Sequence, residues 1–267
     1  MRNDFSTIIV EDGTDADEAI ITITMNRPEK KNAANGVMWE ELRETFRQIA
    51  ILNNHRVVIL TGAGGSFCSG ADLWGEGPTD GRNPHWLSAM DNISDLALAL
   101  HRLPMPVIAK VRGVAAGAGM NMALGCDLIV ASDNARFSEI FARRGLSVDF
   151  GGSWVLPRLI GMHKAKELAL FADILDAHEA KEFGLVNRVV ADDQLDDFVA
   201  NWARRLAAGP PIALAQTKRL LTNSFSMTMA EALDAEAAAQ TINFTTKDTE
   251  EAIRSFTEKR EPKFTGR

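Results

Sequence analysis

The sequence predicts an α/β fold over about its first 200 residues and an all-helical region after them. Continuous apolar runs of strand length, such as Val57–Thr61, predict strands that are buried on both faces. Glycine-rich turns follow two of these runs, as in strand–loop–helix units. Beyond about residue 160 the pattern is mostly helical, with one strand expected near Leu185–Val190. A chain of 267 residues suits one large domain, or one domain with a small appendage.

The predicted elements follow from periodicity and from turn residues. Ile21, Ile23 and Met25 alternate with threonines, which predicts a half-buried strand, and Asn35 is the expected cap of the next helix. Further strands are predicted at 57–61, 106–111, 127–131 and 136–138, with an apolar helix at 117–124. The later helices are predicted at 163–172, 177–183, 192–208, 210–223, 229–243 and 247–257. The amphipathic helices of the C-terminal region have no large core of their own, which predicts packing against another subunit or back on the domain.

Composition excludes several classes of protein. A net charge of −7 and a pI near 5.3 argue against a nucleic-acid-binding protein. Two cysteines, Cys68 and Cys126, cannot form a disulfide framework, so a reduced, cytoplasmic location is expected. No apolar run approaches the about 20 residues of a membrane-spanning helix, and no signal peptide is expected.

The common nucleotide and metal motifs fail on spacing. The loops at 62–67 and 117–122 carry Phe67 and Met122 where a dinucleotide fingerprint needs its third glycine. No Gly-Lys-Ser/Thr triplet and no Gly-x-Ser-x-Gly elbow is present. The five histidines lack paired metal spacing, so no metal site is predicted. Cys68 has no histidine beside it in the sequence, which favours buried filler over a nucleophile.

The two glycine-rich loops, Gly62–Ala71 and Gly113–Gly119, each connect a buried strand to a helix. Small residues leave backbone N–H groups unobstructed, and two such groups that converge on one oxygen form an oxyanion hole. The alternative is that small residues only permit close packing of helix on sheet.

Taken in order along nearly the whole chain, these segments resemble the enoyl-CoA hydratase/isomerase family, the crotonase superfamily. The resemblance begins at Asn26–Ala33, which matches the family's opening NRPxxxNA pattern. The other matching segments are Leu60–Gly62, Phe67–Leu73, Val111–Gly119, Cys126–Asp127, Gly145–Leu146, Gly151–Trp154, Leu156–Arg158, Ala180–Val186 and Glu258–Arg260.

The resemblance implies a ββα spiral core, which we place at 1–200, and a C-terminal helical trimerisation region at 201–267. It implies an acyl-CoA thioester substrate, stabilisation of a thioester enolate, and a homotrimer or dimer of trimers. It implies no permanently bound cofactor, because coenzyme A arrives as part of the substrate. By position, the enolate would be held by the backbone N–H groups of Ala71 and Ala118, each supplying roughly 3–4 kcal/mol.

The sequence departs from the pattern of the family's hydratases at both catalytic glutamates. Asn121 and Phe141 stand at those positions. Neither an amide nor a phenyl ring is a base or an acid near neutral pH. Two-glutamate hydration in its usual form is therefore not expected.

Asp149 lies eight residues beyond Phe141, at a position where isomerase-type members of the family carry aspartate. We therefore predict that Asp149 moves a proton from C2 to C4 of a 3-enoyl-CoA. Neighbouring Phe141, Phe150 and Trp154 favour a raised carboxyl pKa through desolvation. Two alternatives for Asp149 are a nucleophile, as in a hydrolase or dehalogenase of the family, and a cap for a helix that begins near Gly151.

Other residues complete the predicted site. Glu139 shares a face with Phe141 if both lie on a strand, so Glu139, Glu76 and Asn121 are further candidates for catalysis or for substrate orientation. The predicted coenzyme A contacts are Lys30, Lys31, Ala71, Asp72, Leu73, Lys259 and Lys263, and the predicted acyl pocket is Trp74, Phe141, Phe150 and Trp154. The leading function is an acyl-CoA isomerase. The alternatives are an enoyl-CoA hydratase with atypical residues and a non-catalytic acyl-CoA-binding protein.

Overall fold

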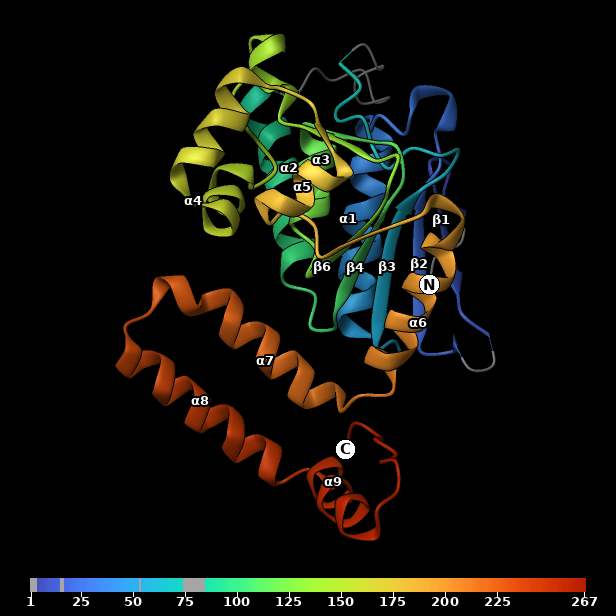
Figure 1. Cartoon of the computed structure of the whole chain (residues 1–267), viewed down its shortest axis with the longest axis vertical. Coiled ribbons are helices and arrows are strands. Elements are labelled where there is room, and N and C mark those ends of the chain that lie inside the picture. The colour runs from blue at the N-terminus through green and yellow to red at the C-terminus, as the bar shows by residue number, and fades with distance from the viewer. Residues whose placement is uncertain (1–3, 15–16, 53, 74–84) are drawn as a thin grey trace.

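The structure is a computed structural model that describes residues 4–14, 17–52, 54–73 and 85–267. It contains two β-sheets, with helices on both faces of the larger one, and a group of C-terminal helices that extends away from them (Figure 1). The predicted α/β architecture with a helical C-terminal region is confirmed.

The larger sheet has six strands in the order β1-β2-β3-β4-β6-β9. The β1–β2 pair is antiparallel, and every other neighbouring pair is parallel. The strands are β1 (Ile8–Asp12), β2 (Ile20–Met25), β3 (Val57–Gly62), β4 (Val107–Val111), β6 (Leu128–Ser132) and β9 (Arg188–Val190). All of these except β1 were predicted from the sequence.

Burial on both faces explains the continuous apolar run of β3. Val58 and Leu60 belong to the main core with helix α1 (Gly36–Ile51), whereas Val57 and Ile59 pack with helix α6 (Leu195–Ala207) on the opposite face. The α1 helix begins at the predicted cap, where the Asn35 side chain accepts a hydrogen bond from Met38 N at 3.0 Å.

The smaller sheet has the order β5-β7-β8. Its strands are β5 (Val114–Ala116), β7 (Arg136–Ser138) and β8 (Leu175–Asp176). Helix α3 (Ala118–Leu124) follows β5, and the 3-10 helix η3 (Ile140–Arg144) follows β7. Because β5 pairs with β7 in this sheet, the predicted second loop and the region of Glu139 lie side by side.

Two further helices, α2 (Trp86–His101) and α4 (Gly152–Phe171), pack on other helices: α2 on α1, and α4 on α3 and η3. The α2 helix was not predicted, and only the second half of α4 was. Gly161, at φ 77° and ψ 162°, interrupts α4, and Pro157 lies inside it. These two helix-breaking residues hid its first half from the sequence pattern.

The helices α5 (Ala177–Phe183), α7 (Pro211–Asn223), α8 (Met229–Phe244) and α9 (Lys247–Glu258) form where they were predicted. All of α7 is described, and none of its residues is buried, whereas α8 buries Ala239 alone. Figure 1 shows α7 and α8 as an antiparallel pair that projects away from the sheets. The α6 helix crosses the predicted boundary at residue 200 and packs on the larger sheet through Ala203, so the division into 1–200 and 201–267 stays a prediction. Within the described residues, no helix has the length and apolar character that crossing a membrane requires.

Candidate active site

The two glycine-rich loops lie side by side in parallel register. Cys68 N donates to Val114 O and Ala116 N donates to Cys68 O, both at 2.9 Å, which pairs Cys68 with Ala115. Ala71 and Ala118 each lie three residues beyond this pair. The two alanines predicted to hold an enolate oxygen therefore occupy equivalent positions in the two paired loops.

The first loop is held in place by buried Asn32. Its Nδ2 donates to Ala63 O at 2.9 Å and to Ser66 O at 2.7 Å, and its Oδ1 accepts from Arg27 N at 2.9 Å. Asn32 adopts φ 55°, a left-handed conformation that asparagine tolerates better than most residues. Asn32 belongs to the predicted Asn26–Ala33 motif, in which no function was assigned to it. Its role is to shape the loop.

The second loop places Ala118 at the first residue of α3. Gly117 precedes it at φ 54° and ψ −129°, a conformation that favours glycine. Gly119 is also required by space, because a Cβ there would lie 2.3 Å from Cys68 O. Ala118 itself is not left-handed, so alanine leaves its backbone donor intact.

The N–H groups of Ala71 and Ala118 remain available. Among the residues that the structure describes, neither amide donates to an acceptor. Gly70 approaches the second loop so closely that a Cβ on it would lie 2.9 Å from Ala116 O and 3.8 Å from Ala118 N. Such a pair of adjacent unused donors is chemically suited to an oxygen that gains negative charge.

Asn121 connects the buried Glu139 with the half-buried Asp149. Its Nδ2 donates to Glu139 Oε2 at 3.3 Å and to the backbone O of Asp149 at 3.0 Å. Glu139 is 1% exposed and Asn121 is equally buried. The strand on which the inward orientation of Glu139 was predicted is absent, because Ile140–Arg144 forms η3. Glu139 nevertheless points inward, from the residue before that helix.

Three acceptor atoms in this cluster are buried without a donor among the described residues: Asn121 Oδ1, Glu139 Oε1 and Asp149 Oδ1. Burial raises the pKa of Asp149 to about 6. Burial, together with the charge of Asp149, raises the pKa of Glu139 to about 7, although the Asn121 hydrogen bond opposes this rise. Groups with such pKa values can exchange protons near neutral pH.

The structure does not show Asp149 as a helix cap. The α4 helix begins after Gly151, which has no side-chain cap, and Gly152 N donates to the backbone O of Asp149 rather than to its carboxylate. The next residue, Phe150, has φ 50°, which is strained for a bulky side chain. Its ring packs on Trp39, with centroids 5.8 Å apart.

The side chains of the predicted acyl pocket differ in burial and in their contacts. Phe141 is buried, and a Cβ on Gly117 would lie 3.7 Å from its ring, which places the ring against the second loop. Phe150 is buried next to Asp149. Trp154 is 37% exposed and contacts the His101 ring edge-to-face, with centroids 5.3 Å apart. The contact of Trp39 with Phe150 and the contact of His101 with Trp154 were not predicted from the sequence.

Most of the predicted coenzyme A contacts lie on or beside the first loop, and their contact with coenzyme A stays a prediction. Lys30 and Lys31 are exposed, and their backbone oxygens accept from Ser69 of that loop. Asp72 binds the Arg27 guanidinium at 2.9 Å, and Leu73 is 55% exposed.

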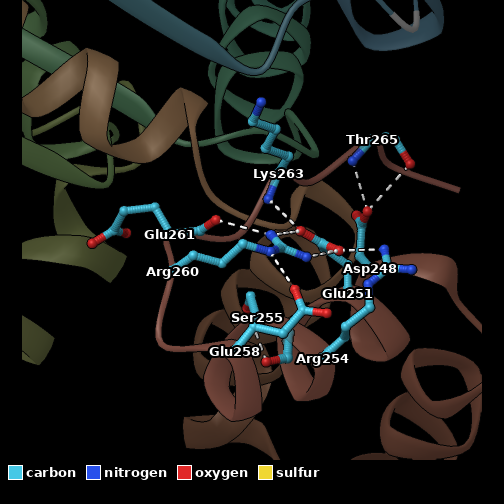
Figure 2. Close-up of polar contacts among 10 residues, drawn as sticks. Asp248, Glu251, Arg254, Ser255, Glu258, Arg260, Glu261, Lys263 and Thr265 are labelled. Carbon is cyan, nitrogen blue, oxygen red and sulfur yellow. Dashed lines mark hydrogen bonds and ion pairs between the residues drawn. The ribbon is translucent and has the colours of Figure 1, made fainter.

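The other two lysines lie elsewhere in this chain. The C-terminal segment folds back on α9, where Glu251 accepts from Arg260 and from Lys263 N, and Asp248 accepts from Thr265 N (Figure 2). Arg56 binds Phe264 O at 2.9 Å, which fixes this segment beyond the amino end of β3. The loops lie beyond the carboxyl end of β3, about 20 Å of strand away. The structure therefore does not bring Lys259 and Lys263, both exposed, to the site within one chain.

Three remaining predictions concern Trp74, Glu76 and Cys68. Trp74 and Glu76 lie outside the described residues. Cys68 is fully buried, and burial raises the pKa of its thiol to about 11, so it stays protonated and serves as packing rather than as a nucleophile. No group of three or more His, Cys, Asp or Glu side chains suited to a metal ion occurs in the described part of the chain.

Comparison with known proteins shows the family to which this chain belongs. The model of the enoyl-CoA hydratase/isomerase family matches residues 15–267. The chain is 37% identical to a 1,2-epoxyphenylacetyl-CoA isomerase of Escherichia coli, covering 94% of this chain and 97% of that protein. It is 32% identical to a trans-2-decenoyl-[acyl-carrier-protein] isomerase of Streptococcus mutans, covering 94% and 96%.

Among solved structures, an enoyl-CoA hydratase from Bacillus anthracis superimposes with a TM-score of 0.91 at 34% identity, covering 98% of this chain and all of that one. The names of these relatives include both hydratases and isomerases. The fold and the sequence agree over nearly the full length, and the chain belongs to the enoyl-CoA hydratase/isomerase family, the crotonase superfamily.

Proposed function

We propose that this protein is an acyl-CoA isomerase that moves a double bond through a thioester enolate, with Asp149 as its single base. The observation that carries the proposal is the Asp149 carboxylate. Its Oδ1 is buried without a donor among the described residues, and burial raises its pKa to about 6. A carboxylate in this state is ionised at neutral pH and has an oxygen available for a substrate proton.

The proposed reaction needs one proton carrier. Asp149 takes a proton from C2 of a 3-enoyl-CoA, and the electron pair of that C–H bond moves toward the thioester carbonyl. The N–H groups of Ala71 and Ala118 stabilise the enolate oxygen. Asp149 then returns the proton to C4 while the double bond forms between C2 and C3. Atoms and charge balance without a metal or a redox cofactor; coenzyme A is part of the substrate.

A specific observation supports enoyl-CoA hydration as the second candidate. Glu139 is 1% exposed, its Oε1 has no donor in the part of the chain that the structure describes, and burial raises its pKa to about 7. A carboxyl in this state has the chemistry to activate water. It occupies neither of the two positions at which the family's hydratases carry glutamate, so it would be an atypical hydratase residue.

The names of the relatives define the substrates to test. One acts on an epoxyphenylacetyl-CoA, by its name, and another on a decenoyl thioester of an acyl carrier protein. We therefore propose a panel of 3-enoyl-CoA thioesters of increasing length, an aromatic epoxide thioester, and a decenoyl thioester on coenzyme A and on a carrier protein. Lys30 and Lys31, beside the first loop, are the proposed phosphate contacts.

The test is to incubate each thioester with pure protein in heavy water and to measure product masses. An isomerase yields a product isomeric with its substrate, with deuterium at C2 or C4. We expect Asp149→Asn to lower kcat by at least about 100-fold while acyl-CoA still binds, because the amide is no base. Asp173→Asn, at an exposed carboxylate paired with Arg143, is the matched control and should leave kcat unchanged.

The other outcomes each point to a different function. A product heavier by one water, with activity lost in Glu139→Gln, supports the hydratase. A free acid or a displaced leaving group, with activity lost in Asp149→Asn, supports Asp149 as a nucleophile. Tight acyl-CoA binding with no deuterium exchange at C2 supports a non-catalytic binding protein. Full turnover in Asp149→Asn overturns the role of this residue.

A further inference from the structure

Glu139 remains unused in the proposed isomerisation, although it is among the most buried carboxyl groups that the structure describes. Among the residues that the structure describes, neither a lysine nor an arginine pairs with it, and its hydrogen-bond partner there is the Asn121 amide. A buried acidic side chain without a cationic partner is costly, so its position needs a physical reason.

The Asn121 amide shows how Glu139 is connected to the base. Asn121 uses both hydrogens of Nδ2, one on Glu139 Oε2 and one on the backbone O of Asp149. If the Asn121 amide were rotated by half a turn, its oxygen would face two acceptors, Glu139 Oε2 and the backbone O of Asp149. These two contacts therefore determine the orientation of the Asn121 amide. Glu139 is thus linked through one side chain to the main chain of Asp149, immediately before the strained Phe150.

The count of donors and acceptors points to a neutral Glu139. Asn121 Oδ1, Glu139 Oε1 and Asp149 Oδ1 are three buried acceptors without a donor in the described structure. Because Glu139 Oε2 already accepts from Asn121, a proton on this carboxyl belongs on Oε1. That proton would turn one of the three acceptors into a donor and would leave Asp149 as the single negative charge of the cluster.

Within the described residues, the surroundings of Glu139 offer no competing charge. The α3 helix has no charged residue. Among described groups, Asp149 is the one whose charge acts on Glu139. The charged side chains of the adjoining elements either have other partners or are exposed. Arg143 pairs with Asp173, Arg158 lies over the Trp154 ring, and Lys164 lies over the Phe183 ring. The exposed ones are Arg136, Arg144, His163, Lys166 and Glu167.

We propose that Glu139 is a positioning residue that works in its protonated form: through the Asn121 amide it holds the Asp149 main chain in place, and it releases this hold when it ionises. Ionisation would strengthen the hydrogen bond that Glu139 accepts from Asn121, but it would also place two negative charges in one dry cluster. Burial and the charge of Asp149 together outweigh the Asn121 bond, so an ionised Glu139 lowers its free energy by leaving the buried position. The proposal rests on the proposed function of Asp149 and adds a second, separately titrating group that turns the site off at alkaline pH.

The test compares wild type, Glu139→Gln and Glu167→Gln, an exposed glutamate on α4 that controls for the change of charge. Each is assayed with a 3-enoyl-CoA at pH values between about 5 and about 9. In wild type and Glu167→Gln, kcat should fall above a midpoint near neutrality, by up to about tenfold per pH unit. Glu139→Gln, which is permanently neutral and keeps the acceptor for Asn121, should retain the acid limb due to Asp149 and lose the alkaline fall.

Two more measurements separate this inference from the proposed function. Infrared spectra of the free protein at pH 6 should show a carboxylic-acid C=O band that loses the contribution of one carboxyl group in Glu139→Gln, whatever the substrate proves to be. The contribution of Asp149, whose pKa is about 6, should remain in that variant. Asn121→Leu, which removes the amide, should lower kcat at every pH while KM stays within about twofold. A pH profile of Glu139→Gln that superimposes on wild type, or an infrared carboxylic-acid band that is unchanged in Glu139→Gln, would overturn the inference without touching the role of Asp149.

Discussion

Asp149 and Glu139 are ionisable side chains whose burial destabilises the folded protein at neutral pH. Each has a pKa above its ordinary value, raised from 3.8 to about 6 and from 4.5 to about 7. The folded state therefore binds more protons than the unfolded state between these values, and this contribution to stability falls as the pH rises through that window. Below the ordinary pKa values the penalty disappears.

This sign predicts the effect of Glu139→Gln on stability. The difference in unfolding free energy between the variant and wild type should grow in favour of the variant from about pH 4 to about pH 8. Its change should not exceed roughly 3 kcal/mol, the equivalent of the pKa rise. Urea unfolding at several pH values measures this difference. A difference that stays constant with pH would show that Glu139 titrates in the folded protein as it does in the unfolded chain.

At the residue scale, the sequence was informative where a motif fixed a backbone position. The resemblance to the family assigned Ala71 and Ala118 by position, and the structure sets them at equal offsets from the Cys68–Ala115 pair. Glu139 was a candidate for the wrong reason, since its orientation comes from a 3-10 helix rather than from strand alternation. The Asn121 contacts to Glu139 and Asp149 join residues far apart in sequence, and no local pattern predicts such contacts.

At the scale of elements, prediction succeeded where one side-chain period covered the whole element. The buried strands and the later helices met this condition. The β5 strand has three residues, too few to show a period, and each of its residues pairs with a β7 residue 22 positions later in the chain. The α2 helix and the first half of α4 were missed, the latter because proline and glycine within it break the helical signal.

The close pairing of the two loops predicts that Gly119→Ala damages both stability and activity. The new Cβ would lie 2.3 Å from Cys68 O, so the loops must separate. We expect a loss of about 1–3 kcal/mol in unfolding free energy. We also expect kcat to fall by about 100-fold, because Ala71 and Ala118 would no longer meet at one oxygen.

A glycine in open surroundings provides the control for this prediction. Gly36 begins α1, and a Cβ there meets nothing within 4 Å. Gly36→Ala should leave kcat unchanged and stability the same or slightly higher. Denaturant unfolding and steady-state kinetics on both variants make the comparison. Unchanged kcat in a folded Gly119→Ala protein would argue against a catalytic role for the paired loops.

At the scale of the whole molecule, the C-terminal helices are tied to the rest of the chain by a few polar contacts. Lys218 of α7 binds Asp127 at 2.6 Å and Met105 O at 3.0 Å, and Arg158 of α4 lies between Trp154 and Phe225. These contacts fix the position of α7 and α8 but cover little of their surface. Large apolar side chains therefore stay exposed there: Leu221, Phe225, Met229, Leu233, Ile242 and Phe244.

Exposed apolar side chains in such number on one helical pair predict that the chain associates with copies of itself through α7 and α8. Sedimentation equilibrium should give a mass that is a multiple of 29.1 kDa, three or six times that value for the predicted trimer or dimer of trimers. Leu233→Glu combined with Phe244→Glu, at side chains 51% and 72% exposed, should shift the mass toward the monomer by placing charge in the interface. Ile51→Glu, at a side chain 78% exposed on α1, is the control and should leave the mass unchanged.

Association also decides whether the C-terminal lysines reach a substrate. Within one chain, Lys259 and Lys263 lie beyond the end of the larger sheet that is opposite the two loops, so a contact with coenzyme A requires a neighbouring subunit. Lys263→Ala should then raise KM for an acyl-CoA in the assembled protein, because a phosphate loses a cation. The same substitution should have no effect on KM in the dissociated Leu233→Glu, Phe244→Glu background. A wild-type protein that sediments at 29.1 kDa at every concentration would contradict both expectations, since the lysines would have no neighbouring site to reach.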